Sequence, residues 1–425
     1  AKFETDSDAP SLSYYEPHVV VYIEEYTING QRQNVLSDVG GLYAWYRSLV
    51  EDVNTAVSPE IRQLSDSLTG GLSTDREKVQ AVFDWVQDNI KYVAFEDGMS
   101  GFIPREASKV CSKRYGDCKD MTSITTELLK AANIPAYLTW IGSRDIPYSY
   151  SELPTPMVDN HMIAAVKLDG EFVFLDATSQ YTPIGFPTAF IQGKEALVGV
   201  GSENFELVQV PEVAMERNSY RDSIVLEVNG AEVIGTAEAR FSGYQKVDMV
   251  RPFNARPVNK QKDFIQARLI KGHNKFRLDD FSVTGADNKA TDFQVDYRFT
   301  VPDYAKNIGS AVYINLNLDK TLYNEQIDPQ VRKLPIEVKY KTVEEFITDL
   351  RIPEGYRVDY LPKDQEFRNE AFGFSMQYRQ EDGRVILTKR IYSNTLVVQP
   401  EQFEAWNQMI ESIDQAYNEV VVLKQ

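Results

Sequence analysis

The sequence predicts an α+β fold, in which helices followed by antiparallel strands form a first unit and a β-rich, sandwich-like region comes after it. Two observations carry this prediction. Apolar residues recur at helical spacing up to residue 133, whereas alternating apolar residues and hairpin turns dominate from residue 136 onward. Because helices and strands are grouped rather than alternating along the chain, the pattern favours an α+β arrangement over a parallel α/β sheet.

The length of the chain indicates more than one domain. Its 425 residues exceed what a single ordinary core supports. Residues 13–27 have the pattern of a strand with no upstream partner, as at the end of an earlier β module. The remnant of that upstream module is expected at residues 1–35, and the α+β unit at residues 36–200. The β-rich region is expected at residues 218–425, either as one domain or as two domains at about 218–335 and 336–425.

The composition excludes several classes of function. Hydrophobic residues make up 43% and aromatic residues 12% of the chain, which is enough to bury several cores and argues against disorder. The formal net charge of -18 opposes binding to nucleic acid or to an anionic membrane surface, because no basic block offsets the repulsion. No apolar run approaches the roughly 20 residues that a membrane-spanning helix needs.

Cysteine and histidine usage predicts no metal site and no cofactor. The two cysteines, Cys111 and Cys118, have a spacing that matches no zinc pattern, and the three histidines are scattered. No EF-hand loop for calcium is present. We expect both thiols to stay unbridged, because the start of a helix leaves little freedom for a disulfide across so short a loop.

Four helical patterns precede residue 134. The third starts with Thr74 and Glu77 at the spacing of a capping box, and the apolar stripes of all four must be buried. The patterns lie in residues 37–52, from Ser58 to Leu68, from Thr74 to Ile90, and from Cys118 to Asn133.

Strand patterns follow the helices. A strand is expected at residues 136–142, and Asp169-Gly170 has the signature of a hairpin turn between residues 161–168 and 171–176.

The β-rich region alternates most clearly in residues 293–301, FQVDYRFTV, whose odd-numbered apolar residues point to one side. Further strands are expected before Asn229-Gly230 and on both sides of Asp382-Gly383. Two helices are expected to interrupt the strands, at residues 258–271 and from Pro400 onward.

Cys118, in the stretch RYGDCKDMTS, is the first candidate for chemistry. A thiol is a useful nucleophile only as the thiolate. If Asp117 caps the helix, Cys118 is its first residue, where unpaired backbone N–H groups and the helix dipole favour an anion. Lys119, Arg114 and Lys113 add positive charge nearby. Taken alone, the position also suits a buried cysteine that packs as a small apolar side chain.

His161 and Asp176 are the candidate partners of this thiol. In a hairpin with a two-residue turn at Asp169-Gly170, Asp176 faces Ile163, so Asp176 and His161 are diagonal neighbours on one face, about 7 Å apart at the backbone. An aspartate that accepts from one imidazole nitrogen orients the other nitrogen toward a nucleophile. Each residue alone has a simpler structural explanation, but the three together indicate catalysis.

Three segments resemble the transglutaminase-like superfamily of papain-fold cysteine enzymes. They are VFDWVQDNIKY, YGDCKDMTSITTELLKAANIPAYL and DNHMIAAVKLDGEFVFLDAT, within residues 36–200. The resemblance implies a papain-like core with Cys118 as nucleophile, His161 as general base and acid, and Asp176 as orienting carboxylate. More narrowly, the chain resembles envelope or secreted proteins of Bacteroidetes-type bacteria with flanking β-rich domains, which implies a periplasmic or extracellular location.

These features lead to two functional hypotheses. The first is acyl transfer at amide bonds of a protein or peptide, with cell-wall peptide among the candidates, through a thioester on Cys118; water or an amine then completes the reaction. The second is a catalytically silent envelope scaffold with a retained papain-like core. One departure from the family concerns the oxyanion hole: the segment before Cys118 offers no Gln or Trp donor, which leaves Tyr115 or a residue from elsewhere.

Overall fold

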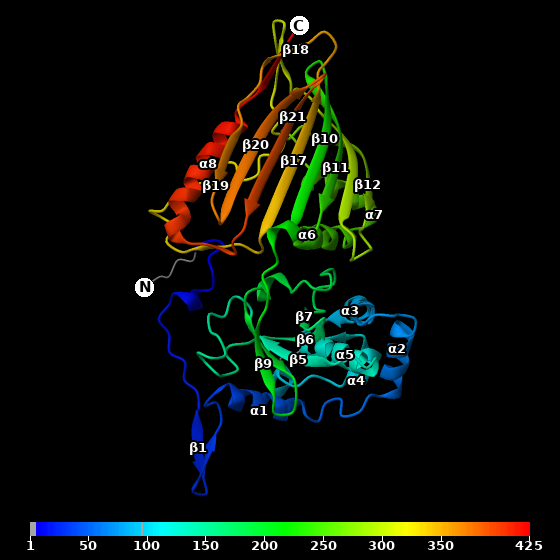
Figure 1. Ribbon diagram of the computed structural model, residues 1–425, viewed down its shortest axis with the longest axis vertical. Coiled ribbons are helices and arrows are strands. Elements are labelled where there is room, and N and C mark those ends of the chain that lie inside the picture. Colours follow the sequence, from blue (N-terminus) through cyan, green and yellow to red (C-terminus); the bar gives the residue numbers. More distant parts are fainter. Residues whose placement is uncertain (1–5, 95–96) are drawn as a thin grey trace. The chain divides into compact units, whose positions relative to one another are not determined.

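The chain folds into two units, and the computed structural model describes residues 6–94 and 97–425 of it (Figure 1). The first unit is Pro10–Glu212, and the second is Val213–Gln425 together with residues 6–9. The first unit therefore extends beyond the expected limits of 36–200 at both ends. In the described part of the chain, no helix is both long and apolar enough to cross a membrane.

An antiparallel sheet of five strands forms the centre of the first unit, in the order β7-β6-β5-β8-β9. The strands are β5 Ala136–Ile141, β6 His161–Leu168, β7 Glu171–Leu175, β8 Glu195–Gly199 and β9 Phe205–Gln209. Ala164 and Val166 of β6 belong to the core on the helical side, whereas Ile163 and Ala165 belong to the core on the opposite side. Because residues 162–166 of β6 are buried on both faces, they are all apolar rather than alternating.

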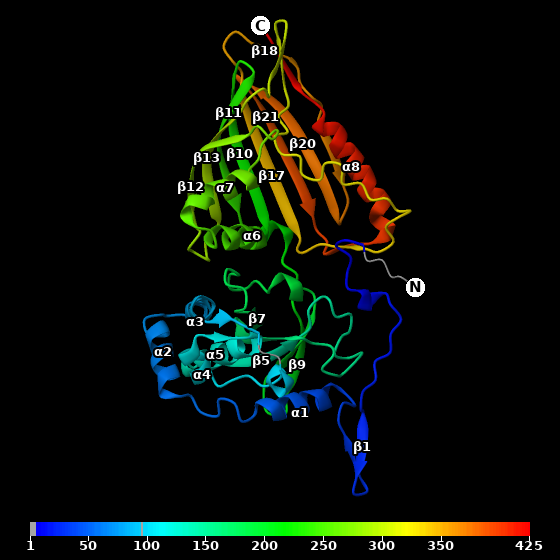
Figure 2. The same ribbon diagram turned by 180° about the vertical axis from the view of Figure 1, so that it is seen from behind.

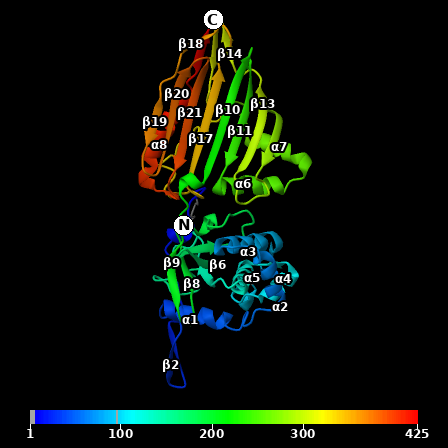
Figure 3. The ribbon, with the colours of Figure 1, turned by 45° about the vertical axis from the view of Figure 1, so that its right-hand side comes forward.

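Helices α2, α3, α4 and α5 gather on one side of this sheet, as Figure 3 shows. The helices of the first unit are α1 Val39–Val50, α2 Pro59–Thr69, α3 Asp75–Asn89, α4 Ala107–Lys113 and α5 Cys118–Ala131. The four predicted helices are confirmed, including the capping box of Thr74 and Glu77. Helix α4 was not predicted; its seven residues are too few for a periodic pattern.

The strand predicted at residues 13–27 is much shorter in the structure. Only β1 Glu25–Ile28 is a strand, and it pairs with β2 Gln31–Asn34 in a hairpin that is exposed throughout. Within the described residues no neighbouring strand pairs with residues 17–23, so their backbone has no ladder to join.

Helix α5 is buried on nearly all sides. It packs against β6 and against helices α2, α3 and α4, and its threonines and serine allow close approach because their hydroxyl groups bond to backbone carbonyls. The hydroxyl of Thr122 lies 2.8 Å from the Cys118 carbonyl oxygen and 2.9 Å from that of Met162 in β6. This contact ties the first turn of the helix to the start of the strand.

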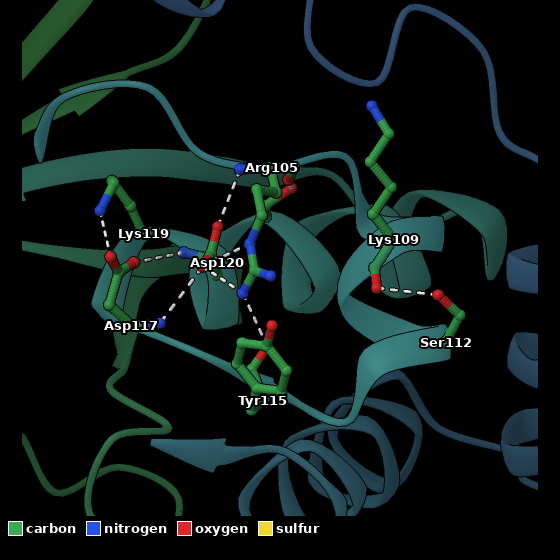
Figure 4. Close-up of polar contacts among 8 residues, drawn as sticks. Arg105, Lys109, Ser112, Tyr115, Asp117, Lys119 and Asp120 are labelled. Atoms are coloured by element: carbon green, nitrogen blue, oxygen red, sulfur yellow. Dashed lines mark hydrogen bonds and ion pairs between the residues drawn. The ribbon is translucent and has the colours of Figure 1, made fainter. Parts of the chain in front are cut away.

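The N-terminus of α5 is held by a network of charges (Figure 4). Asp117 and Asp120 form a capping box, each side chain accepting from the other residue's backbone N–H at 3.3 Å. The Arg105 guanidinium donates to Asp120 Oδ2 at 2.7 and 3.0 Å, and the Arg105 backbone N–H donates to Oδ1 at 2.8 Å. Lys119 donates to the other oxygen of Asp117.

Gly116 is required by the same packing. A Cβ atom at this position would lie 2.5 Å from the Cβ of Asp120, which is closer than nonbonded carbons approach. The sequence Tyr115-Gly116 forms the short strand β4 beside β3 Lys91–Tyr92, so the chain enters α5 from a fixed direction.

One large sheet organises the second unit, with the strand order β12-β13-β11-β10-β17-β21-β20-β19. Its strands are β10 Ser219–Asn229, β11 Glu232–Phe241, β12 Arg277–Thr284, β13 Phe293–Val301, β17 Thr342–Arg351, β19 Gln365–Arg368, β20 Phe372–Glu381 and β21 Arg384–Ser393. The parallel pairing of β10 with β17 joins the two halves, so the alternative division near residue 335 does not interrupt the sheet.

One face of this sheet is covered and the other is open. Figure 2 shows α6 Gly243–Asn254, α7 Val258–Arg268, α8 Phe403–Tyr417 and residues 315–341 over one face. The opposite face carries exposed polar side chains such as Asp296 and Arg298. The cover thus consists largely of helices and irregular chain, where the sequence suggested sandwich-like packing.

Smaller strands complete the second unit. A four-stranded sheet has the order β14-β15-β23-β18, and β16 pairs with β22. These strands are β14 Lys306–Ile308, β15 Ala311–Ile314, β16 Ile336–Glu337, β18 Arg357–Tyr360, β22 Val397–Val398 and β23 Val421–Lys424. Helix α6 was missed in the sequence because Gly243 and Pro252 resemble helix breakers.

Replacing Asp120 by alanine should destabilise the first unit by about 3–5 kcal/mol, because it leaves Arg105 without its buried partner and removes a cap. Urea unfolding followed by tryptophan fluorescence measures this loss, since Trp45, Trp85 and Trp140 lie in this unit. Asp75→Ala is the matched control: its ion pair with Lys78 is exposed and should contribute less than about 1 kcal/mol. Equal losses in the two variants would contradict the anchoring role of Asp120.

Candidate active site

Cys118 is the first residue of α5, as the sequence predicted. Its side chain is largely buried and lines a cavity of about 290 Å³. The backbone N–H groups of the first turn of α5 are near it, where the helix dipole favours negative charge.

His161 and Asp176 meet as the hairpin register predicted. Leu168 pairs with Glu171 and Ala164 with Leu175, so Asp176 directly follows β7 and His161 opens β6. The distance between His161 Nε2 and Asp176 Oδ2 is 2.8 Å, and both side chains are buried.

The carboxylate of Asp176 is held on both oxygens. Thr178 donates to Oδ1 from its backbone N–H at 3.1 Å and from its hydroxyl at 2.6 Å, and the Thr188 hydroxyl donates to Oδ2 at 2.6 Å. Burial opposes ionisation, but His161 and the two threonines outweigh it and hold the pKa of Asp176 below its ordinary value.

The same contacts keep the imidazole of His161 charged. Burial lowers the pKa of His161, but the Asp176 carboxylate and a hydrogen bond with Cys118 more than compensate, and together they raise this pKa to about 10. Since Nε2 is bonded to Asp176, Nδ1 is the nitrogen left for the thiol. The ring of Phe190 packs edge-on against the imidazole, with 5.2 Å between the ring centroids.

The structure thus brings Cys118, His161 and Asp176 together in one site. Two of the basic residues close to Cys118 in the sequence interact with other groups. Lys119 lines the cavity but donates to Asp117, and the Arg114 guanidinium lies over the ring of Trp85. Both cysteines are free thiols, and Cys111 packs at the edge of the helical core. No cluster of potential metal ligands occurs in residues 6–94 and 97–425.

Residues from the loop before β6 form one wall of the cavity. Pro156, Asp159 and Asn160 line it, whereas Tyr148, Tyr150 and Pro154 of the same loop do not. Asn160 closes the loop by accepting from the Ser143 N–H at 2.9 Å and donating to the Ser143 hydroxyl at 3.1 Å.

Trp140 is a cavity residue that the sequence did not reveal. It lies on β5 opposite Met162, one position from His161, and its ring stacks on Tyr46 with 4.9 Å between centroids. The family pattern places the donor upstream of Cys118, whereas this indole lies downstream of it in the sequence. Tyr115, the alternative considered, does not line the cavity.

Asp159 is a second cavity residue that was missed. Its Oδ2 accepts from the hydroxyl groups of Tyr46 at 2.6 Å and Tyr150 at 2.9 Å. No hydrogen bond within the described residues reaches its Oδ1. Burial raises the pKa of Asp159 to about 7, although the two tyrosine hydroxyls act in the opposite direction.

Comparisons with known proteins agree with this fold. The model of the transglutaminase-like superfamily matches residues 62–177, which include Cys118, His161 and Asp176. Residues 310–423 match DUF3858, a domain of unknown function with a solved structure. Among curated proteins, no match is found.

Two solved structures are similar to the chain. A "putative protease" from Parabacteroides distasonis aligns over 96% of this chain and 64% of its own, with 10% identity and a TM-score of 0.55. A "putative cysteine protease" from Cytophaga hutchinsonii aligns over 28% of this chain and 37% of its own, with 23% identity and a TM-score of 0.22. The chain thus spans less than two thirds of either protein. The family match at residues 62–177 agrees with the helices and antiparallel sheet described above, and the chain therefore carries a domain of the transglutaminase-like superfamily.

Proposed function

We propose that this chain is a cysteine-dependent enzyme that cleaves amide bonds of protein or peptide substrates through a thioester. Cys118 is the nucleophile, His161 the general base and acid, and Asp176 the orienting carboxylate. One observation carries the proposal: Asp176 is hydrogen-bonded to His161, and His161 interacts with Cys118 at the N-terminus of a helix, beside an accessible cavity.

The acylation step follows from this arrangement. Because His161 is in the imidazolium form, with the proton given up by the thiol on Nδ1, Cys118 attacks the carbonyl carbon of the amide as the thiolate. The resulting oxyanion is stabilised by the Cys118 backbone N–H and by the Trp140 indole N–H, which makes no hydrogen bond within the described residues. His161 then donates its proton to the departing nitrogen, the C–N bond breaks, and a thioester with Cys118 remains.

Deacylation reverses the proton movements. Water, or an amine in an acyl-transfer reaction, attacks the thioester carbonyl and gives a proton to His161. The C–S bond breaks, the acyl group leaves as an acid or a new amide, and the thiolate is regenerated beside the imidazolium. Asp176 stays ionised throughout and keeps Nε2 as a donor, so that Nδ1 always faces the sulfur.

The family resemblance extends this proposal to location and substrate. It supports a periplasmic or extracellular protein, for which cell-wall peptides are accessible substrates. Digestion of purified peptidoglycan fragments, with the Cys118→Ala protein as control, tests this part; new amino termini released only by the unsubstituted protein are the expected result.

Iodoacetamide labelling at neutral pH tests the nucleophile without a known substrate. Cys118 should react faster than Cys111, the internal comparator, whose pKa is raised by burial. His161→Ala should slow the labelling of Cys118 by about tenfold or more, because a thiol without a basic partner is only a few per cent ionised near pH 7. Mass spectrometry follows both sites, and His18→Ala is the matched control. Equally slow labelling of both cysteines would favour the scaffold hypothesis instead.

The ion pair predicts an unusual titration of His161. In ¹³C-labelled protein, one of the three histidine Cε1 signals should remain in the imidazolium form up to about pH 10, and it should be absent from His161→Ala. Since this pKa is raised above the ordinary value of 6.5, the charged imidazole stabilises the fold fully below pH 6.5, and the contribution is lost as the pH rises toward 10. Asp176→Asn should move the titration to lower pH. An unshifted titration in Asp176→Asn would refute the pairing.

Asp159 predicts a preference for substrates with a positive charge near the cleaved bond. Its carboxylate lines the cavity and is ionised mainly above pH 7. The ratio of kcat/KM for lysine-containing peptide amides to kcat/KM for glutamine-containing ones should therefore increase as the pH rises through 7. Asp159→Asn should remove this pH-dependent gain, whereas Asp145→Asn, outside the cavity lining, should keep it. A ratio that does not change with pH would contradict the assignment.

A further inference from the structure

The second unit contains a cavity of about 590 Å³ that is separate from the candidate active site. Its floor is formed by the covered face of the large sheet. Thr342 and Glu344 of β17 lie there, directly opposite Ser393 and Ile391 of β21 in the strand register.

Most of the cavity wall is apolar. It comes from the chain between β15 and β17, from β22 and from helix α8. The wall residues include Leu322, Ile327, Ile336, Val338, Val398 and Trp406. A concave, largely apolar cavity of this size with a few polar groups is typical of a site for a small organic ligand.

Two polar groups on the floor have unused hydrogen-bonding capacity. Glu344 Oε2 accepts from the Thr321 hydroxyl at 3.1 Å, and no hydrogen bond or ion pair within the described residues reaches Oε1. Ser393 Oγ is buried and has no hydrogen-bond partner in the described part of the chain. The nearby buried cation of Lys389 donates to the Asp319 carbonyl oxygen instead. An unpaired buried hydroxyl such as that of Ser393 is costly and therefore rare, and it lines the same cavity as the half-buried Glu344 carboxylate.

The charge around the cavity is negative. Asp8, Glu325 and Asp328 line it besides Glu344, and Arg332 is the basic residue of the lining. The guanidinium of Arg332 donates to the carbonyl oxygens of Ser7, Leu334 and Pro335, so its N–H groups are used within the fold. This lining repels a carboxylate or phosphate ligand and attracts a cation.

Burial raises the pKa of Glu344, although the Thr321 hydroxyl and Lys389 oppose that shift. A cation beside the carboxylate would restore the ionised form, because opposite charges at short distance favour each other.

We propose that this cavity binds an amphiphilic primary amine. The ammonium group donates to Glu344 Oε1 and Ser393 Oγ, and the apolar body lies against Trp406 and the aliphatic wall. These hydrogen bonds would give Glu344 Oε1 and Ser393 Oγ the partners that they lack within the described part of the fold. This inference is independent of the chemistry at Cys118.

Fluorine NMR of the whole chain labelled with 5-fluorotryptophan tests the proposal. The four tryptophans give four signals; Trp406 is the one in this unit, and Trp406→Phe identifies its signal. Hexylamine, hexanol and hexanoate, which share one apolar body, are titrated at pH 7. We expect hexylamine to shift the Trp406 signal saturably, with hexanol and hexanoate weaker by about tenfold or more. The signal of Trp140 reports separately on the candidate active site.

Glu344→Gln removes the carboxylate with little change in volume and should weaken hexylamine binding by about tenfold or more. Glu345→Gln is the matched control on the opposite face of β17, and it should bind hexylamine as the unsubstituted protein does. The proposal is overturned if hexylamine leaves the Trp406 signal unmoved at millimolar concentration, if the three probes bind alike, or if the two variants bind alike.

Discussion

The anchored N-terminus of α5 is the constraint on which the rest of the first unit depends. Asp120 is bonded to the guanidinium and backbone of Arg105 and to the backbone of Asp117, so the first turn of the helix cannot fray. Gly116 lets the chain pass close enough to Asp120 for this to happen. The position of the Cys118 side chain is therefore set by a network that does not include its sulfur.

His161 and Asp176, the partners of the thiol, are positioned by a different structural feature, the register of the β6–β7 hairpin. A slip of one residue would place Asp176 and His161 on opposite faces of the sheet. Thr122 connects the N-terminus of α5 to the hairpin, since its hydroxyl lies between the Cys118 carbonyl oxygen and that of Met162, the residue next to His161. Once the helix packs on the sheet, burial strengthens the charge interactions among the three side chains, because the dielectric is low and water no longer competes.

Carboxylates in the interior of the protein serve two different purposes. Asp176 is saturated with donors and stays ionised, which suits an orienting group. Asp159 and Glu344 each keep an oxygen without a partner in the described residues and face a cavity. Neither of these oxygens is fully buried, so each can accept a hydrogen bond from a molecule that enters its cavity.

The sequence by itself determined the features that depend on neighbouring residues: the four helices, the capping box at Thr74, the start of α5 at Cys118, and the hairpin that pairs His161 with Asp176. These follow from local periodicity, capping and turn chemistry. Only the tertiary structure decided which distant residues meet. Trp140 and Asp159 reach the cavity through the pairing of β5 with β6 and the packing of Tyr46 and Tyr150. The parallel pairing of β10 with β17 likewise joins strands more than a hundred residues apart. Contacts of this kind form when the apolar faces of separate elements are buried against each other. Periodicity within one segment shows that its apolar face must be buried, but it does not show which other element covers that face.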